Sequence, residues 1–338
     1  RLFNTIQFYT YPKGLKNIWH LKPRRLLRLL LSRLPLVSKL LKKNLDCLPD
    51  YSNREMRSQF DHILKHKHHD FILISYIYWA GLIENNPFIK GKTILDYSDF
   101  TTMILNDSES GNIDIGSFFK EEIRRVNLFD RVMCISFDEY WLISQFAASP
   151  RFFYVPHFLE SSGIVREKKK YDLLFIGSDN PFNRDGLEWF LKDIYPVIGS
   201  EPKMKICGDI ASVIGTHKRI FKEPSFEQLN DVYRDVKILV VPLLGGAGLK
   251  IKVIEALSFG IPVITTPKGV VGFRNKTGNG CLVVDDESGF IREIDRLLSD
   301  PAYYSDHSNA ALSYFDTQFG MEQAYRLLDT VFKLEGAN

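Results

Sequence analysis

A glycine-rich turn between a predicted strand and a predicted helix carries the residues best suited to chemistry. The segment reads VVPLLGGAGLKIKVIEALSFG and holds Gly245, Gly246 and Gly248 just before the helix. Glycines let backbone amides approach a ligand closely, and the helix start aims free N–H groups and a positive dipole at the same point. Lys250 and Lys252 add positive charge where the dipole disfavours it unless an anion binds there. The pattern therefore predicts a phosphate-binding site.

Lys252 and Glu255 are three residues apart, and this spacing places them on one face of the predicted helix. The lysine is then able to meet phosphate oxygens while the carboxylate accepts hydrogen bonds from a pair of ribose hydroxyls. An ordinary ion pair between the two side chains on the helix surface is the alternative. The spacing therefore favours a nucleotide as the ligand.

Strands and helices alternate along the chain on both sides of a polar stretch at residues 161–170. Before it, the apolar runs FILISYIYWA and KTILDYSDF predict strands of a parallel sheet buried on both faces. After it, a second alternation runs from YDLLFIG to IPVITTP. We therefore expect an α/β protein with a first domain over residues 1–158 and a doubly wound domain over 171–312, whose ligands lie outside the carboxyl ends of the strands. The amphipathic tail, 313–338, is expected to pack back across the lobes as a helix.

Two helices of the second domain carry signals for their ends. Ser225 and Gln228 stand at capping-box spacing, which predicts a helix start within SFEQLNDVYRD. Gly260 follows the helix that ends in LSF, and Pro262 prevents the helix from continuing. We therefore expect Gly260 to end that helix in the left-handed conformation.

The composition excludes several classes of protein. Hydrophobic residues make up 45% of the chain and charged residues 25%, which is ordinary for a globular protein and excludes a disordered, fibrous or disulfide-rich one. The longest uncharged stretch, residues 71–83, is too short to cross a bilayer, which needs about 20 helical residues. We recognise no signal peptide, nucleophile elbow or P-loop in a chain that opens with Arg1. These features predict a cytoplasmic protein that is neither a serine hydrolase nor a P-loop kinase.

Neither the cysteines nor the histidines show the spacing of a typical metal site. The four cysteines are far apart and three lie in apolar runs, which indicates buried, reduced thiols. His62 and His66 are one helical turn apart, in a run that continues to Asp70, so a metal site is one interpretation. Because such runs are usually exposed helix ends, we expect no metal.

Residues 22–43 form a basic arm in which leucines alternate with arginines and lysines at a spacing close to helical. Residues 1–45 contain eleven Lys or Arg and no Asp or Glu, although the whole chain has a net charge of only +3. Such an arm can lie on an anionic membrane, or it can pack on its own domain through the leucines, and the sequence favours neither. The stretch has no interleaved aromatic residues, which argues against nucleic acid as a partner.

Three segments of the second half resemble a known family. GAGLKIKVIEALSFGIPVITTP resembles the donor-site signature of family four GT-B glycosyltransferases, which transfer sugar from nucleotide donors with retention of anomeric configuration. FIGSDNPFNRDGLEWFLKDIYPVI is similar to the family's glycine loop and first helix, and DVYRDVKILVVPL to the stretch before the signature. The resemblance covers most of residues 171–332 and implies the GT-B fold, two Rossmann-like doubly wound domains facing a cleft. The first strand and glycine loop of the family's N-terminal domain are not recognisable here.

The resemblance assigns roles to three side chains after the glycine-rich turn. Glu255 corresponds to the second glutamate of the family's Glu-x7-Glu motif, which holds the ribose, and Lys252 corresponds to the diphosphate-binding lysine. Lys250 matches a basic position in one branch of the family. Residues of the first glycine loop are expected to line the diphosphate cleft, and these are Gly177, Asn183 and Arg184.

The chain departs from the family pattern at two positions. The first glutamate of the motif, which contacts the transferred sugar, falls on Ala247, so the backbone of Ala247, Gly248 and Leu249 is expected to replace it. In the first domain, LDYSDF resembles a segment that ends in a His-Asp pair, with Ser98 in place of the histidine and Asp99 retained. Asp99 is expected to face the donor sugar or to orient the acceptor hydroxyl, and a cap at the strand end is the alternative.

Together these observations predict a hexosyltransferase-type glycosyltransferase. It would move a sugar from a nucleoside-diphosphate donor to a glycan or lipid-linked acceptor, with retention, in cell-surface polysaccharide or lipopolysaccharide biosynthesis. The nucleotide sugar is its co-substrate, and no other cofactor is expected. Lys250, Lys252 and the helix start would stabilise charge on the leaving nucleoside diphosphate. The alternatives are a non-catalytic scaffold that retains the donor site and a GT-B nucleotide-sugar epimerase, because fold alone does not determine function.

Overall fold

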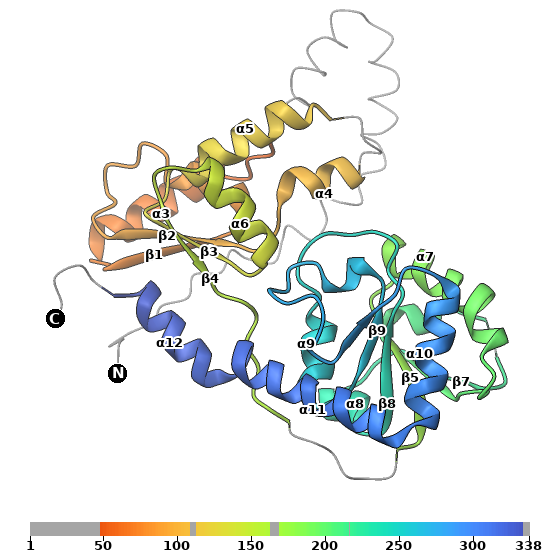
Figure 1. Ribbon diagram of the computed structural model, residues 1–338. Helices are drawn as coiled ribbons and strands as arrows, with labels where there is room; N and C mark the ends of the chain where they lie inside the picture. Colours follow the sequence, from red (N-terminus) through yellow and green to blue (C-terminus); the bar gives the residue numbers. More distant parts are fainter. Residues whose placement is uncertain (1–47, 109–112, 163–168, 216, 334–338) are drawn as a thin grey trace, which may run out of the picture.

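The computed structural model describes residues 48–108, 113–162, 169–215 and 217–333, which form two α/β lobes that each contain one parallel sheet (Figure 1). The sheet of the first lobe has the order β1-β2-β3-β4. Its strands are β1 Phe71–Ser75, β2 Lys92–Tyr97, β3 Arg131–Cys134 and β4 Arg151–Tyr154. Its helices are α3 Arg54–His66, the 3-10 helix η2 Ile77–Leu82, α4 Thr101–Ser108, α5 Ile115–Val126 and α6 Phe137–Phe146.

The first predicted strand is shorter and less buried than the sequence suggested. Only the first half of FILISYIYWA is a strand, since η2 begins at Ile77. Within β1, Ile72 and Ile74 are buried while Leu73 is 45% exposed. The expectation of burial on both faces is therefore wrong for β1, because it is an edge strand covered on one face only. It holds for β3, where all four residues are buried.

The sheet of the second lobe has six parallel strands in the order β10-β9-β8-β5-β6-β7. Its strands are β5 Tyr171–Ile176, β6 Met204–Cys207, β7 Ile220–Glu223, β8 Val236–Val241, β9 Val263–Thr265 and β10 Cys281–Val283. The helical elements are α7 Pro181–Trp189, the π-helix η3 Phe190–Ile194, the 3-10 helices η4 Tyr195–Val197, η5 Asp209–Ser212 and η6 Pro267–Val270, and α8 Leu229–Tyr233, α9 Ile251–Ser258 and α10 Glu287–Ser299. The strand order reverses between β5 and β8, and this is the point where doubly wound sheets bind ligands.

One of the two predicted helix ends is confirmed and the other is wrong. Gly260 follows α9 with a φ of 64°, the left-handed conformation expected at a helix end. The capping box at Ser225 does not form, because α8 begins only at Leu229 and its N-cap residue, Gln228, makes no capping hydrogen bond through its side chain. Phe226 packs against the core of the lobe. We attribute the missing capping box to burial of this ring, which stabilises the chain more than one further helical turn at Ser225 would.

The last two helices connect the lobes (Figure 1). Helix α11, Pro301–Gln318, packs against α9 of the second lobe, and α12, Met321–Val331, lies beside the first sheet. The Phe332 and Phe71 rings are 5.2 Å apart between centroids. The buried guanidinium group of Arg131 donates to the Lys333 carbonyl at 2.8 Å and also to that of Val331. The boundary expected between residues 312 and 313 falls inside α11 and stays a proposal.

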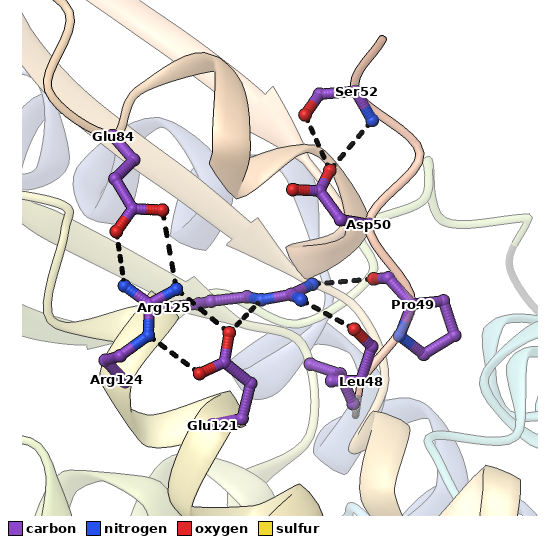
Figure 2. Close-up of polar contacts among 8 residues, drawn as sticks. All are labelled: Leu48, Pro49, Asp50, Ser52, Glu84, Glu121, Arg124 and Arg125. Atoms are coloured by element: carbon purple, nitrogen blue, oxygen red, sulfur yellow. Dashed lines mark hydrogen bonds and ion pairs between the residues drawn. The ribbon is translucent and has the colours of Figure 1, made fainter. Parts of the chain in front are cut away.

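Helix α5 holds the start of the described chain through a buried arginine (Figure 2). Arg125, 4% exposed, donates to the carbonyl oxygens of Leu48 and Pro49, each at 2.6 Å, and to Glu121 at 2.8 Å. Arg124 donates to the same Glu121 from the next position. A buried guanidinium with several acceptors stabilises only this path of the chain, because any other would leave its donors unpaired.

Two predictions concern the environment of the protein. Cys134, Cys207 and Cys281 are buried free thiols, as expected, whereas Cys47 and the basic arm 22–43 lie outside the described residues. No helix within the described ranges is long and apolar enough to span a bilayer.

Candidate functional site

The two glycine loops meet where the strand order of the second sheet reverses. Gly177 follows β5, and the loop of residues 242–250 follows β8, its neighbour in the sheet. A Cβ on Gly177 would lie 2.8 Å from the Asn183 side chain, and one on Gly208 would lie 2.4 Å from the Gly177 carbonyl oxygen. Side chains at these two positions would collide, so glycine is required where the chain after β5 packs against the start of α7 and against the chain after β6.

The glycine-rich turn leaves the start of α9 without a side-chain cap. Gly246 and Gly248 have φ angles of 94° and 78°, which only glycine adopts without strain. The N-cap residue is Lys250, whose backbone is extended and whose side chain makes no capping hydrogen bond. The first N–H groups of a helix have no partner within it, so this start is available to an anion.

Lys252 joins the two loops through Asn183. Its Nζ donates to Asn183 Oδ1 at 3.0 Å and lies 5.1 Å from the centre of the Phe175 ring. Asn183 is buried and donates in turn to the Ser178 carbonyl at 3.0 Å. Burial and the nearby charge of Lys250 lower the pKa of Lys252 to about 8. An anion beside this ammonium group would raise the pKa of Lys252 again, because it favours the charged form.

Arg184, the other candidate in the first glycine loop, is directed elsewhere. It is exposed and forms an ion pair with Asp179, donating to one carboxylate oxygen at 2.5 Å. The structure therefore brings Asn183, and not Arg184, into contact with Lys252.

Glu255 is oriented by a buried tyrosine. The Tyr233 hydroxyl donates to Glu255 Oε2 at 2.6 Å, and Tyr233 itself is fully buried. Burial, followed by the charge of Glu255, raises the pKa of Tyr233 well above its ordinary value, so the tyrosine remains a donor. Lys252 and Glu255 thus turn to different partners instead of to each other. The other oxygen, Glu255 Oε1, is left to accept from a ligand such as a diol.

Lys250 faces the first lobe from the other side of the turn. Its Nζ donates to the carbonyl oxygens of Ala247 and Gly248 at 2.7 and 2.9 Å. Burial lowers the pKa of Lys250 to about 8, although Glu139 and Asp99 of the first lobe act in the opposite direction. Two lysines with lowered pKa values at one uncapped helix start are an arrangement suited to a diphosphate.

The first lobe presents two carboxyl groups towards this turn. Asp99 follows β2, and a Cβ placed on Gly248 would be 3.3 Å from its Oδ1. Glu139 lies in the first turn of α6 and is 5% exposed. Burial, opposed by the charge of Lys250, raises the pKa of Asp99. Burial and the charge of Asp99 raise the pKa of Glu139 to about 8.

A reciprocal contact holds the two lobes together beside these carboxyl groups. The Phe137 N–H donates to the Gly272 carbonyl at 2.8 Å, and the Gly272 N–H donates to Asp138 Oδ2 at 2.8 Å. Lys276 pairs with the same Asp138 oxygen at 2.5 Å. We call these four residues the lobe latch. The latch fixes the start of α6, and with it Glu139, against the second lobe.

Our sequence interpretation missed Glu139, Tyr233 and the lobe latch. Ser136 and Glu139 stand at capping-box spacing, and Ser136 does accept from the Glu139 N–H at 3.3 Å. That signal would have assigned Glu139 to a helix cap, whereas its Oε2 is buried without a hydrogen-bond partner among the described residues. Nothing in the local sequence distinguishes Tyr233 from an ordinary core tyrosine.

The histidine run shows no metal-binding geometry. The His62 and His66 rings stack 4.2 Å apart, and His66 Nδ1 lies 2.7 Å from the His62 carbonyl oxygen. His68 lies 3.4 Å from Asp70 on the exposed surface. Among the described residues, no group of three or more His, Cys, Asp or Glu side chains could hold a metal ion.

Comparisons of sequence match the second lobe to a family. The model of "Glycosyl transferases group 1" matches residues 170–300. An uncharacterized 44.6 kDa protein in the cps region of Klebsiella pneumoniae is 24% identical, and the match covers 82% of this chain and 77% of that protein.

Solved structures share the fold of the whole described chain. TarM from S. aureus has a TM-score of 0.66 at 16% identity, over 82% of this chain and 58% of TarM. The sucrose-phosphate synthase of Thermosynechococcus elongatus has a TM-score of 0.63 at 17% identity, over 83% of this chain and 81% of that one. HepE of Anabaena, solved in complex with UDP and glucose, has a TM-score of 0.62 at 11% identity, over 83% and 82% of the two chains. The chain thus spans less than two thirds of the length of TarM.

The family match and the fold agree with each other. The matched residues contain both glycine loops and the whole of α9, and the two parallel sheets have the arrangement of GT-B enzymes. Residues 170–300 therefore match a domain of the group 1 glycosyltransferases, and the two lobes together have the GT-B fold.

Proposed function

We propose that this glycosyltransferase binds a nucleoside-diphosphate sugar at the start of α9 and transfers the sugar, with retention, to a glycan or lipid-linked acceptor. The observation that carries the proposal is the pair of partly buried lysines at an uncapped helix start. Burial lowers the pKa values of Lys250 and Lys252 to about 8. A diphosphate would stabilise both ammonium groups, and its own charge would be stabilised further as the bond to the sugar breaks.

The nucleoside would lie beside Glu255. With one oxygen held by Tyr233, the carboxylate can accept a hydrogen bond from a ribose hydroxyl through the other. Asn183 orients Lys252, and the backbone around Gly177, Gly246 and Leu249 would line the path of the diphosphate. Under this proposal residues 171–312 bind the donor and residues 1–158 face the acceptor, with Asp99 towards the transferred sugar.

Cell-surface polysaccharide is the class of product that the comparisons favour. The Klebsiella pneumoniae relative is encoded in a cps region, and HepE was solved with UDP and glucose. These facts support a hexose donor and a surface-glycan acceptor for this chain as well, in polysaccharide or lipopolysaccharide assembly at the cytoplasmic side.

A first experiment measures binding of UDP, GDP, dTDP, ADP and CMP, and of their sugar conjugates, by thermal shift and calorimetry. One nucleoside diphosphate should stabilise the native protein, and Glu255→Ala should lose that response. Glu322→Ala, the same change at an exposed position of α12, is the matched control and should keep it. No response of the native protein to any nucleotide would refute the proposed donor site.

Turnover distinguishes transfer from the alternatives. With the selected nucleotide sugar and an extract of acceptor glycans, the native protein should release nucleoside diphosphate and extend a glycan. Lys252→Ala should lower this rate at least a hundredfold, since removing one preorganised positive group costs about 3 kcal/mol of transition-state stabilisation. Release of a free altered sugar would indicate an epimerase, and binding without turnover would indicate a scaffold.

The basic arm 22–43 is proposed to bring the enzyme to an anionic membrane that carries a lipid-linked acceptor. The support is its composition alone, with leucines between arginines and lysines. Sedimentation with vesicles of phosphatidylglycerol and phosphatidylcholine at low salt tests this proposal. The full chain should sediment with the anionic vesicles and remain in solution with purely zwitterionic ones, and equal behaviour with both would contradict the proposal.

A further inference from the structure

Glu139 carries a buried carboxyl oxygen that the protein itself does not use. Its side chain is 5% exposed, and its Oε2 is buried and has no hydrogen-bond partner among the described residues. An unpaired buried acceptor lowers stability, and native structures contain few of them. Such an atom at the interface of two lobes therefore indicates a partner that the lobes do not themselves provide.

The first lobe satisfies another buried glutamate completely, so the free oxygen of Glu139 is not a general property of this lobe. Glu122 is fully buried, and its two oxygens accept from the Tyr97 hydroxyl, the N–H groups of Thr101 and Thr102, and the Thr102 hydroxyl, at 2.5 to 2.9 Å. Glu122 thus holds the start of α4 in place. Glu139 is equally enclosed but has a vacant acceptor, which is the pattern of a ligand-binding group.

The surroundings of Glu139 show where the missing partner would lie. Its charged neighbours are Asp99 and Glu122 of the first lobe and Lys250 of the second. Lys250 in turn binds the carbonyl oxygens of Ala247 and Gly248. Glu139 therefore approaches, from the first lobe, the lysine that binds the backbone of Ala247, where the family signature has a glutamate.

We propose that Glu139 binds a hydroxyl group of the transferred sugar, in place of the carboxylate that the family signature has at position 247. This inference rests on the proposed donor site, since the sugar must be attached to a diphosphate held by Lys250 and Lys252. A hydroxyl group suits the position because it can donate to Oε2 or accept from the proton that a carboxyl group with a pKa of about 8 keeps at neutral pH.

The lobe latch makes this contact depend on closure of the lobes. Phe137 and Asp138, the two residues before Glu139, are the ones that bond to Gly272 of the second lobe. When the latch is formed, the start of α6 cannot move away from the glycine-rich turn. The carboxyl from the first lobe then reaches the sugar in the closed enzyme, and opening of the latch would withdraw it.

The test compares the affinity for a nucleoside diphosphate with that for its sugar conjugate, in the native protein and in Glu139→Met. The probes are UDP with UDP-glucose, and GDP with GDP-mannose, measured by calorimetry on the full chain. Glu139→Met should leave the Kd for the nucleoside diphosphate within twofold of native and raise the Kd for the sugar conjugate about tenfold, the effect of losing one hydrogen bond to a carboxyl group. If Glu139→Met shows the same difference in affinity between the nucleoside diphosphate and its sugar conjugate as the native protein, the inference is overturned.

A second variant and a set of deoxy donors keep the test independent of folding. Glu139→Gln keeps the length and shape of the side chain, and it should fold like the native protein and raise the Kd of the sugar conjugate at least threefold. Native protein should bind one of the 2-, 3-, 4- or 6-deoxy conjugates about tenfold more weakly than the parent sugar, and Glu139→Met should lose that discrimination. Equal discrimination in native protein and variant would refute the contact.

Glu122→Gln is the matched control because it makes the same change at a buried glutamate whose oxygens are all used. Glu122→Gln should lower the thermal midpoint and leave the preference for the sugar conjugate intact. Glu139→Gln should leave the thermal midpoint unchanged and weaken that preference. If native protein binds UDP or GDP but Glu139→Gln and Glu139→Met retain the sugar contribution, only the role of Glu139 fails. If native protein binds no nucleoside diphosphate, the proposed donor site fails as well.

Discussion

Replacing Lys252 by methionine is expected to stabilise the ligand-free protein while it abolishes diphosphate binding. The ammonium group is partly buried beside Lys250, which disfavours its charge in the folded state and lowers its pKa from 10.5 to about 8. In the unfolded chain the same group is hydrated and keeps its ordinary pKa. Methionine has a similar length, carries no charge and adapts to irregular packing. The substitution therefore removes an unfavourable charge without leaving a large cavity.

The magnitude follows from the pKa of Lys252 in the folded protein. A fall from 10.5 to about 8 corresponds to a cost of about 3 kcal/mol in the free energy of unfolding. The cost is complete below pH 8, where the lysine is charged in both states, and it disappears as the pH rises from 8 towards the unfolded value of 10.5. Loss of the hydrogen bond to Asn183 offsets about 1 kcal/mol. Lys252→Met should therefore raise the free energy of unfolding by about 2 kcal/mol at pH 7.

Urea unfolding of the ligand-free protein at pH 7, followed by circular dichroism, measures this change. Lys205→Met is the control with the opposite sign. Burial alone would lower the pKa of Lys205, but its hydrogen bond with Glu223 and the charge of Asp235 outweigh burial and raise it. Removing this lysine takes away the ion-pair partner of Glu223 and leaves Asp235 with only the exposed Lys170, so stability should fall by about 3 kcal/mol. If Lys252→Met instead loses more than about 1 kcal/mol, burial of an unbalanced charge is the wrong account of this site.

The ligand-bound protein should respond in the opposite way. Saturating nucleoside diphosphate stabilises native protein by mass action, by about 2.7 kcal/mol at a concentration one hundred times Kd. Lys252→Met should gain nothing from the same ligand concentration. A variant that is more stable when free and insensitive to ligand would show that the start of α9 exchanges stability for anion binding.

Three further predictions concern the same turn and the contact between the lobes. Tyr233→Phe removes the hydrogen bond that orients Glu255, so the Kd for a nucleoside diphosphate should rise about fivefold by calorimetry; an unchanged Kd would show that Glu255 needs no support. Because burial lowers the pKa values of Lys250 and Lys252 to about 8, affinity for a nucleotide sugar should be level up to pH 7 and fall roughly tenfold for each lysine between pH 7 and 9. Calorimetry over this range checks the prediction, and a flat profile counts against it. Asp138→Ala removes about 1 kcal/mol from the lobe latch and should enlarge the radius of gyration of the ligand-free protein in small-angle scattering; a radius equal to that of the native protein would contradict the latch.

Local sequence determined the features of this protein that depend on the backbone of a few neighbouring residues. The glycine-rich turn and the end of α9 at Gly260 could be predicted because positive φ angles require glycine, whatever the rest of the chain does. The alternation of strands and helices could be predicted because hydrophobic periodicity is a property of each segment. The helix start at Ser225 was predicted wrongly because the same local signal competes with burial of Phe226 in the lobe core.

Only the tertiary structure decided which partners the site residues have. Lys252 binds Asn183 at a separation of 69 residues, and Glu255 binds Tyr233 at 22. Glu139 comes from the other lobe altogether, and its sequence context is that of a helix cap. Burial, unlike turn geometry, depends on every element that packs around a side chain, and burial is what lowers the pKa of the lysines and leaves one oxygen of Glu139 without a partner. The residue types at the glycine-rich turn were therefore evident from the sequence, whereas their electrostatics and the carboxyl group facing them follow from how the two lobes pack.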